Sequence, residues 1–338
     1  MKAKVFSLTL LILTIALVIN RPAIAQQTND DVNVKVKNYS KTYPVDANDK
    51  LQVDNRYGRV TVTTWAKNEI KVDVQIKVAE SVASNTQKQL DDITITDSKE
   101  GGVVSFKTNM RDPKKSSWTS WFTNRGNSYQ KIEINYTISI PAKTALTISD
   151  HYGFINLPDM EGSVNINSAY GGFSAKSLTN TDNSINVSYG SANIENMRAG
   201  DLNVKYGSLT IGTIDKLNAN VSYSAAKIGK LGTSGNINMR YGGGLQIADV
   251  GRGLKNLTVN STYSGVKLGL GNDMNADFNV TVKYGSFNYN NHAVNITQTP
   301  GSNRRGWSPT QNYIGHLGKG DADKLISIST TYGSVKFE

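Results

Sequence analysis

The residues with the clearest chemical potential lie in a segment that mixes basic and aromatic side chains. Between residues 111 and 130 the chain carries Lys114, Lys115, Trp118, Trp121, Phe122 and Arg125. Indole rings interleaved with cations can stack on sugars or bases, or enter a membrane interface. The same composition also suits a long hairpin tip whose tryptophans fold back onto a sheet. These six residues are the candidate ligand-binding set, and the structural alternative stays open.

Catalysis is not indicated by the acidic residues or the histidines. Repeat folds that cut polysaccharides need carboxylates in register on neighbouring strands, or a calcium site beside a basic residue. The carboxylates fall mainly in turns, at unequal offsets from the repeat: Asp159, Asp182, Glu195, Asp201, Asp215 and Asp249. The three histidines, His151, His292 and His316, lack ligand spacing. We therefore predict no catalytic residue, no metal site and no cofactor.

Three basic residues keep one enzymatic alternative open. Lys205, Arg240 and Lys283 each precede a tyrosine, so they could share one column of a repeat structure. A column of cations could act on an acidic polysaccharide. The simpler interpretation is that they are solvent-facing strand residues.

The element that recurs along the chain is a tyrosine followed by glycine or serine, between two alternating apolar runs. The copies are centred on Tyr57, Tyr152, Tyr170, Tyr189, Tyr206, Tyr223, Tyr241, Tyr263, Tyr284 and Tyr332. From the second to the ninth copy the spacing is 17 to 22 residues. A fixed period of about 20 residues is typical of a stacked repeat array. We predict that the tyrosines form a ladder at one corner of the stack.

Each copy predicts two short strands joined by a bend. In the copy at 202–211, Leu202 and Val204 share the parity of Tyr206, whereas Leu209 does not. A regular strand keeps its parity, so a bend or bulge is expected at the glycine, where positive φ has no steric cost. Two copies carry serine at this place, so the sequence does not require positive φ there.

The fold class that follows is all-β: a parallel β-solenoid with two short strands per coil of about 18 residues. One inward stack is predicted for Val187, Val204, Val221, Met239, Val259 and Val282. The competing arrangement is an antiparallel meander, barrel or sandwich. The register repeats at full-unit spacing rather than half-unit spacing, which favours the parallel form. The outward asparagines form either a polar face for a partner or a ladder that fills the coils.

The organisation of the chain is predicted in three parts. Residues 1–25 are typical of a secretory signal peptide, with Lys2 and Lys4 before an apolar stretch and Ala23-Ile24-Ala25 at its end. Residues 26–148 are expected to form an irregular β-sheet cap with one short helix near 80–91. The copy at 51–62 is a first coil whose continuation is interrupted by about 80 residues.

Residues 149–338 are predicted to be the repeats, with an insertion at about 290–325. The sequence ends on the repeat strand 335–338. Exposed strand edges invite further pairing, so we predict that the insertion packs over this end. A mobile lid is the alternative.

Composition narrows the function further. The formal net charge is +10, and the basic residues are scattered rather than clustered, which does not favour nucleic acid as a partner. The chain has no cysteine, which excludes disulfides and thiolate chemistry. We expect export to the periplasm, the cell surface or the medium, with no transmembrane anchor after signal cleavage.

Two phrases, Asn55–Trp65 and Ile134–Ala142, together with the serial tyrosine-glycine units, resemble a known family. The chain is similar to the bacterial putative-adhesin β-strand-repeat proteins, a family of unknown function related to the head-GIN adhesin domains. The resemblance implies an exported, mostly β, solenoid-like protein of a Gram-negative bacterium. It carries over no functional residues, and the glycine-led repeats of the family are led here by tyrosine.

The leading hypothesis is an exported non-catalytic binding or scaffold protein of the cell envelope, with a glycan or an envelope protein as partner. One alternative is a polysaccharide-active β-helix enzyme. A second is a partner in envelope signalling or stress.

Overall fold

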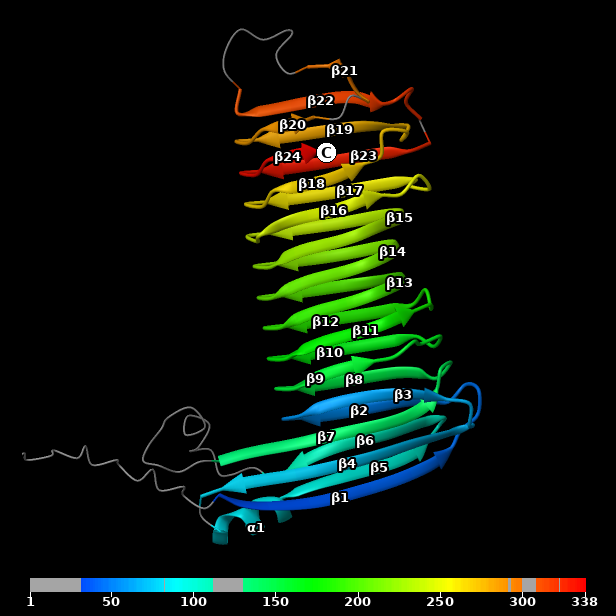
Figure 1. The fold of residues 1–338 in the computed structure, drawn as a ribbon, viewed down its shortest axis with the longest axis vertical. Helices are drawn as coiled ribbons and strands as arrows, with labels where there is room; N and C mark the ends of the chain where they lie inside the picture. Colours follow the sequence, from blue (N-terminus) through cyan, green and yellow to red (C-terminus); the bar gives the residue numbers. More distant parts are fainter. Residues whose placement is uncertain (1–31, 82, 112–129, 291–292, 300–307, 322) are drawn as a thin grey trace, which may run out of the picture. The chain divides into compact units, whose positions relative to one another are not determined.

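The chain is all-β apart from one helix. A computed structural model describes residues 32–81, 83–111, 130–290, 293–299, 308–321 and 323–338. Residues Val32–Glu338 form one compact unit by their contacts, and this unit is described by itself. Its strands belong to one hydrogen-bonded sheet in which the repeats lie level upon level (Figure 1).

The N-terminal strands combine antiparallel and parallel pairing. The elements are β1 (Asn33–Pro44), β2 (Lys50–Arg56), β3 (Arg59–Trp65), β4 (Glu69–Glu80), α1 (Ala83–Asp91), β5 (Ile93–Glu100), β6 (Val103–Met110) and β7 (Gln130–Pro141). Strand β4 pairs antiparallel with β1 and β7, and β5 does so with β6. Strands β6 and β7 continue in parallel onto β2 and β3. The helix predicted near 80–91 is present from Ala83, and its Thr86 and Leu90 are buried.

The middle of the chain supplies the repeats. They contain β8 (Ala145–His151), β9 (Phe154–Leu157), β10 (Val164–Ala169), β11 (Gly172–Leu178), β12 (Asn183–Ser188), β13 (Ser191–Lys205), β14 (Ser208–Ser222), β15 (Ala225–Arg240), β16 (Gly244–Val250), β17 (Asn256–Thr262) and β18 (Val266–Leu270). Successive copies pair in parallel, so Asn186 lies beside Asn203 and Asn203 beside Asn220. The Tyr57 copy joins the same stack through β2 with β8 and β3 with β9.

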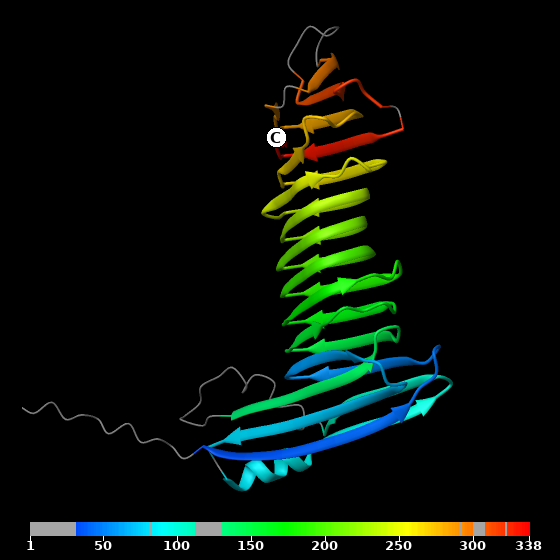
Figure 2. The same ribbon diagram turned by 45° about the vertical axis from the view of Figure 1, so that its right-hand side comes forward.

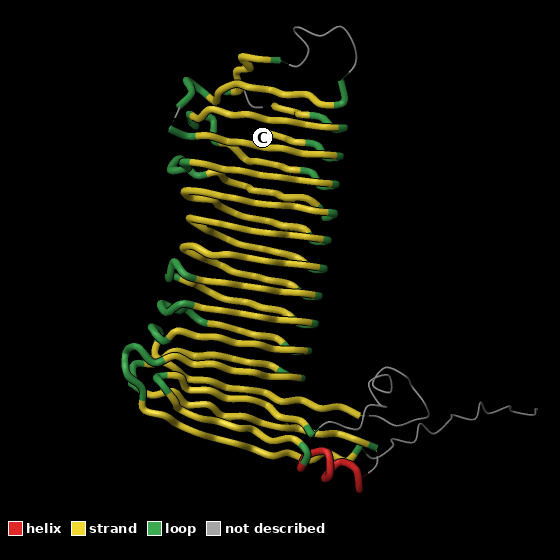
Figure 3. The backbone as a smooth tube through the Cα atoms, turned by 180° about the vertical axis from the view of Figure 1, so that it is seen from behind, coloured by secondary structure: helices red, strands yellow, loops and turns green. Residues whose placement is uncertain are grey.

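The strands of the central copies are longer than predicted. Each of β13, β14 and β15 runs without a break from just after one tyrosine to just before the next. The segment 232–235, with a glycine at each end, lies inside β15. Its extra residue is absorbed by a register shift between Ile214 and Lys216 on β14. Pairing with the neighbouring copies stops at Leu231 and resumes at Ser234, so the bend lies within one strand. Figure 3 shows the stacked strands from behind.

The predicted inward column is wrong at one position. Val187, Val204, Val221 and Met239 do lie on paired positions, each two residues before a tyrosine. Met239 then pairs with Ser261, whereas Val259 pairs with Ile237. The register is set by the distance from the tyrosine, so Val259 belongs to the next inward column. The buried Ser261 hydroxyl donates to the carbonyl oxygen of Ser264 at 2.7 Å.

The last part of the chain departs from sequence order. Its strands are β19 (Ala276–Lys283), β20 (Phe287–Tyr289), β21 (Val294–Gln298), β22 (Thr310–Leu317), β23 (Leu325–Thr331) and β24 (Val335–Phe337). Strand β23 lies between β17 and β19, and β24 lies between β18 and β20, all in parallel. The final repeat is therefore inserted between the two repeats that precede it (Figure 2).

This insertion corrects the prediction that residues of 290–325 cover the final repeat strand. The final strands already have a partner on each side. The described part of the inserted segment instead extends the Tyr284 copy, because β22 pairs antiparallel with β19, and β21 with β22. Residues 300–307, with Arg304, lie outside the described residues.

Candidate functional site

The tyrosine corner has an unusual backbone. All ten tyrosines that head the repeats have positive φ, from 51° at Tyr241 to 63° at Tyr152. The sequence predicted a bend at the following glycine without requiring positive φ there. The bend spans both residues, as at Tyr206 and Gly207, and the positive φ belongs to the tyrosine, since none of those glycines has it. A left-handed conformation in a residue with a β-carbon costs on the order of 1 kcal/mol. Each repeat therefore holds its tyrosine in a strained conformation.

The glycine is required by close approach rather than by its own torsion angles. A β-carbon on Gly207 would lie 1.7 Å from the carbonyl oxygen of Gly190 in the neighbouring copy. The same distance separates a β-carbon on Gly171 from the carbonyl oxygen of Gly153. Where serine replaces glycine, its hydroxyl joins the stack: Ser224 Oγ accepts from the backbone N–H of Gly207 at 2.9 Å. The corner is thus a place where backbones touch.

The tyrosine rings stack in one continuous column. Neighbouring rings have centroids 4.7 to 5.3 Å apart and are within 15° of parallel. In spatial order the column is Tyr57, Tyr152, Tyr170, Tyr189, Tyr206, Tyr223, Tyr241, Tyr263, Tyr332 and Tyr284. Eight of these side chains are about half exposed, between 46% and 52%. Stacking covers the ring faces, so the edges supply the exposed surface. We call this column the tyrosine edge.

Four of the ten residues that directly precede a repeat tyrosine are basic: Arg56, Lys205, Arg240 and Lys283. Lys205 pairs with Ser222, and Ser222 pairs with Arg240. The column continues through Thr262 and Thr331 to Lys283. The predicted shared column of cations exists, but hydroxyl residues separate its members. Such spacing weakens repulsion between like charges, and it provides no pair of cations on adjacent levels.

The outward asparagines three residues before the tyrosines bind one another. Asn186 donates to Asn167 at 3.2 Å, Asn238 to Asn220 at 3.1 Å, and Asn260 to Asn238 at 3.1 Å. At these levels the amide of one asparagine thus satisfies part of the hydrogen-bonding capacity of the next. These contacts fit the ladder-filling interpretation better than that of a free polar face.

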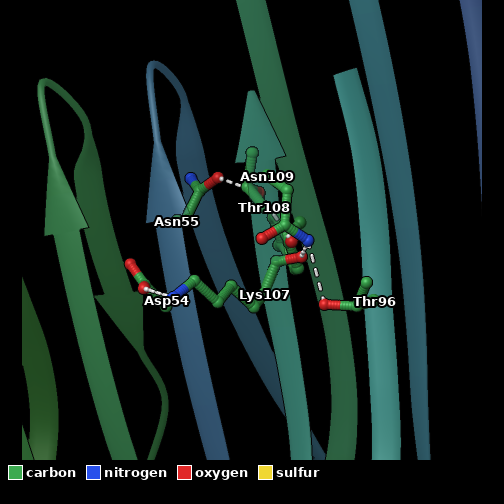
Figure 4. Close-up of polar contacts among 7 residues, drawn as sticks. Asp54, Asn55, Thr96, Lys107, Thr108 and Asn109 are labelled. Carbon is green, nitrogen blue, oxygen red and sulfur yellow. Dashed lines mark hydrogen bonds and ion pairs between the residues drawn. The ribbon is translucent and has the colours of Figure 1, made fainter. Parts of the chain in front are cut away.

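A buried polar cluster lies inside the first levels of the stack. The Thr108 hydroxyl lies 2.8 Å from that of Tyr136, and it donates to Asn55 Oδ1 at 3.3 Å. Asn55 Nδ2 in turn donates to Asp150 Oδ1 and to the carbonyl oxygen of Ile134, both at 3.2 Å. Figure 4 shows Asn55 on β2 beside Thr108 on β6, with the Lys107–Asp54 ion pair (3.7 Å) next to them.

The carboxyl group of Asp150 has the most perturbed chemistry in this cluster. Its side chain is fully buried, and Oδ2 has no hydrogen-bond partner among the described residues. Burial raises the pKa of Asp150 to about 7, and the charge of Asp54 adds to the shift. Burial also raises the pKa of Tyr136. Because the carboxyl group has no access to solvent, its protonation affects the stability of the fold and not the binding of a ligand.

This cluster was not predicted from the sequence, although the sequence contains a signal for it. Asn55, Asp150 and Ser168 stand two residues before a tyrosine, where the next three copies carry valine. Polar residues in an inward column predict a buried network. The contribution of Thr108 could not be predicted, because it depends on β6 lying next to β2.

The predicted site residues are distributed as follows. Lys114, Lys115, Trp118, Trp121, Phe122 and Arg125 lie outside the described residues, as does His292. Among the carboxylates, Asp201 accepts from Asn218 at 2.7 Å and Asp249 pairs with Lys230 at 3.1 Å. Within the described ranges no three His, Cys, Asp or Glu side chains cluster as a metal site. No described helix is long and apolar enough to span a membrane.

Comparison with known proteins gives only distant similarity. No family model and no curated protein matches the chain. A putative cell adhesion protein from Clostridium sporogenes aligns with 90% of this chain and 99% of its own, at 11% identity and a TM-score of 0.23. A putative adhesin from Bacteroides fragilis aligns with 89% of this chain and 97% of its own, at 11% identity and a TM-score of 0.31. A putative lipid binding protein from Parabacteroides distasonis aligns with 89% of this chain and 96% of its own, at 11% identity and a TM-score of 0.32. The first two carry the adhesin description that the sequence resemblance implies, but such low scores assign neither family nor function.

Proposed function

We propose that the protein is an exported, non-catalytic binding or scaffold protein of the bacterial cell envelope, built as a β-solenoid. In this proposal residues 1–25 are a signal peptide, 26–148 a cap and 149–338 the repeat array. Parallel, in-register pairing of successive copies supports the solenoid. The observation that carries the function is the tyrosine edge, a surface with the same chemistry at every level.

A surface of this kind suits an extended partner. Each half-exposed tyrosine offers an aromatic edge and a hydroxyl group, and such side chains bind well at surfaces that are partly apolar and partly wet. One contact of this type is weak. Many contacts made in series to one chain raise the affinity through effective concentration. A glycan chain or an extended segment of an envelope protein fits this geometry.

The tyrosine hydroxyls can be removed without removing the stack. In the variant Tyr189→Phe/Tyr206→Phe/Tyr223→Phe, three consecutive levels keep their rings and lose their hydroxyls. We expect weaker binding on a glycan array and in pull-downs from envelope extracts. The matched control is Asn186→Ser/Asn203→Ser/Asn220→Ser, on the same levels but in another column. Retention of every ligand by the phenylalanine variant would exclude the tyrosine edge as the binding surface.

The segment with Trp118 and Trp121 stays a second proposed contact. The variant Trp118→Ala/Trp121→Ala, measured on the same glycan array, tests it independently of the tyrosine edge. Export is tested by N-terminal sequencing of the protein from the expressing cells. A mature chain that begins at Gln26 would support it, and an intact Met1 in the envelope fraction would contradict it.

A further inference from the structure

A hollow of about 390 Å³ lies on the side of the corner that follows the tyrosines. Ala225, Gly243, Gly244, Gly265 and Ser334 form part of its lining. These residues are small and lie two or three positions after a tyrosine on four neighbouring levels. Small side chains at this position leave the backbone accessible and create a shallow floor.

An extra residue widens the hollow on one level. Ala225 pairs with Gly244, so Gly243 is an insertion relative to the other copies. Gly244 has a φ of +99°, which is open to glycine and not to residues with a β-carbon. A β-carbon there would also lie 3.0 Å from the carbonyl oxygen of Gly265. The run Gly242-Gly243-Gly244 is therefore a local change in the repeat that shapes this surface.

Three lysines border the floor. Lys227, Lys267 and Lys336 each stand four residues after a tyrosine, and all three line the hollow. Lys267 pairs directly with Lys336, and Gln246 separates Lys227 from Lys267. Adjacent strands in a sheet are about 4.8 Å apart, and like charges directly opposite each other are destabilising. The stack thus accepts an electrostatic cost at this place.

The lysines are only partly neutralised. Lys336 Nζ lies 2.6 Å from Glu338 Oε1. The pKa of Glu338 is lowered first by its hydrogen bond to Lys336 and also by the charge of Lys267. Among the described residues Lys227 and Lys267 form no ion pair of their own. Three ammonium groups therefore face one side-chain carboxylate, and the hollow keeps a net positive charge.

We propose that this hollow, with Lys227, Lys267 and Lys336, is a binding site for a carboxylated oligosaccharide, and we call it the lysine groove. The small-residue floor accommodates the flat side of a sugar ring. The ammonium groups pair with carboxylates on successive sugars, and the amides of Gln246 and Asn288 hydrogen-bond hydroxyl groups. The volume falls within the range of about 300–1,000 Å³ typical of small-molecule sites. The proposal goes beyond the tyrosine edge, because it uses other residues and a defined ligand class.

The first test measures affinity by calorimetry at low salt, with oligogalacturonate as the probe and a cello-oligosaccharide of equal length as its neutral counterpart. We expect the wild type to bind only the acidic probe. In Lys227→Gln/Lys267→Gln/Lys336→Gln the affinity should fall by about tenfold or more, the combined effect of three partly exposed ion pairs. The control Lys143→Gln/Lys216→Gln/Lys255→Gln makes the same change in net charge elsewhere and should lose less than about twofold.

A second variant changes shape and not charge. Deletion of Gly243 restores the spacing between the tyrosine and the following strand that the neighbouring copy has, so we expect it to narrow the hollow and weaken oligogalacturonate binding. If this variant does not fold by its thermal melt, the lysine variants decide the question. The phenylalanine variant of the tyrosine edge should bind oligogalacturonate normally, which separates failure of this site from failure of the proposed function.

Several outcomes would overturn the lysine groove. These are absence of oligogalacturonate binding by the wild type, equal binding of the neutral probe, and an equal loss in the control lysine variant. Binding of a DNA oligonucleotide with the same affinity and the same lysine dependence would also do so, since it would show a general polyanion surface.

Discussion

At the scale of single residues, the corner of each repeat balances strain against stacking. A tyrosine with positive φ costs on the order of 1 kcal/mol, and a stacked aromatic pair contributes roughly 0.5–1.5 kcal/mol beyond its buried area. The two terms are similar in size, so the column of rings can offset the strained backbone. Asparagine would adopt the same φ more easily but would not stack in this way. The choice of tyrosine is therefore consistent with a role for the ring itself.

The close contact at the corner predicts a large effect of one methyl group. Gly207→Ala places a β-carbon 1.7 Å from a backbone oxygen, so neighbouring copies must separate. We expect the free energy of unfolding to fall by about 2 kcal/mol or more. Urea denaturation measures it. The control is Gly253→Ala, where the nearest atom would be 3.5 Å away. Similar stability of the two variants would contradict the close-contact explanation.

The buried carboxyl group predicts an inverted pH dependence. Asp150 has its pKa raised from the usual 3.8 to about 7 in the folded chain. Between these values the folded chain keeps a proton that the unfolded chain has lost. The contribution of Asp150 to the free energy of unfolding therefore falls by roughly 4 kcal/mol as the pH rises from about 4 to about 7. Above pH 7 this contribution is constant.

Asp150→Asn removes this titration. The variant should lose the downward slope between pH 4 and 7 and be more stable than the wild type at pH 8, as measured by urea denaturation across that range. Asp215→Asn, at an exposed position, should keep the wild-type slope. An unchanged slope in Asp150→Asn would show that the carboxyl group is ionised in the folded protein.

At the scale of elements, the most consequential strands are the last ones. Strand β23 has parallel partners on both sides, β17 and β19, although these belong to repeats that are consecutive in sequence. The segment between β18 and β19 must therefore climb two levels. This arrangement makes the final repeat part of the stack, so that it links the Tyr263 and Tyr284 copies.

Shortening a side chain at the centre of β23 should weaken the link between the Tyr263 and Tyr284 copies. Ile328 is 2% exposed and pairs with Val259 on one side and Val280 on the other. Ile328→Ala should lower the free energy of unfolding by about 2–4 kcal/mol, because it leaves a cavity in the core between the copies above and below β23. Leu325→Ala on the same strand, 45% exposed, should cost less than about 0.5 kcal/mol. Equal small effects in denaturant titration would argue that β23 is a peripheral addition.

At the scale of the whole described unit, antiparallel strands flank the parallel stack at both ends. Strands β1 and β4 lie beyond the first copies, and β22 and β21 lie beyond the Tyr284 copy. Strand β1 pairs with β4 and with no second strand in the described part of the chain. Its exposed lysines, Lys35 and Lys41 among them, are typical of an edge protected against further pairing.

We therefore predict that the lysines on the edge of β1 prevent association between copies of the protein. Lys35→Thr/Lys41→Thr keeps strand propensity and removes two charges, so we expect concentration-dependent association between copies through this edge. Light scattering coupled to size exclusion measures it. The control Lys216→Thr/Lys255→Thr removes two charges elsewhere and should elute as the wild type does. If both variants associate equally, net charge rather than the edge is the cause.

Some features follow from local pattern and were accessible from the sequence. Alternating apolar residues at a constant period predict an all-β chain, and the amphipathic stretch before Asp91 predicts its helix. Such features depend on residues that are close in the chain, and their side chains must face a core whatever the detailed packing. The polar residues Asn55 and Asp150 in an inward column belong to the same class, and this signal was overlooked.

Other features were decided only when the repeats packed against one another. Whether Tyr206 or Gly207 takes positive φ depends on how closely the backbone of the next copy approaches. The position of β23 could not be read from its order in the chain, because similar repeats offer similar edges, and pairing energy does not depend on sequence order. The lysine groove likewise unites Lys227 and Lys336 from copies distant in sequence. The amino-acid sequence by itself determined the strands and their period, while contacts between copies decided the order of the strands, the strained corners and which side chains share an exposed surface.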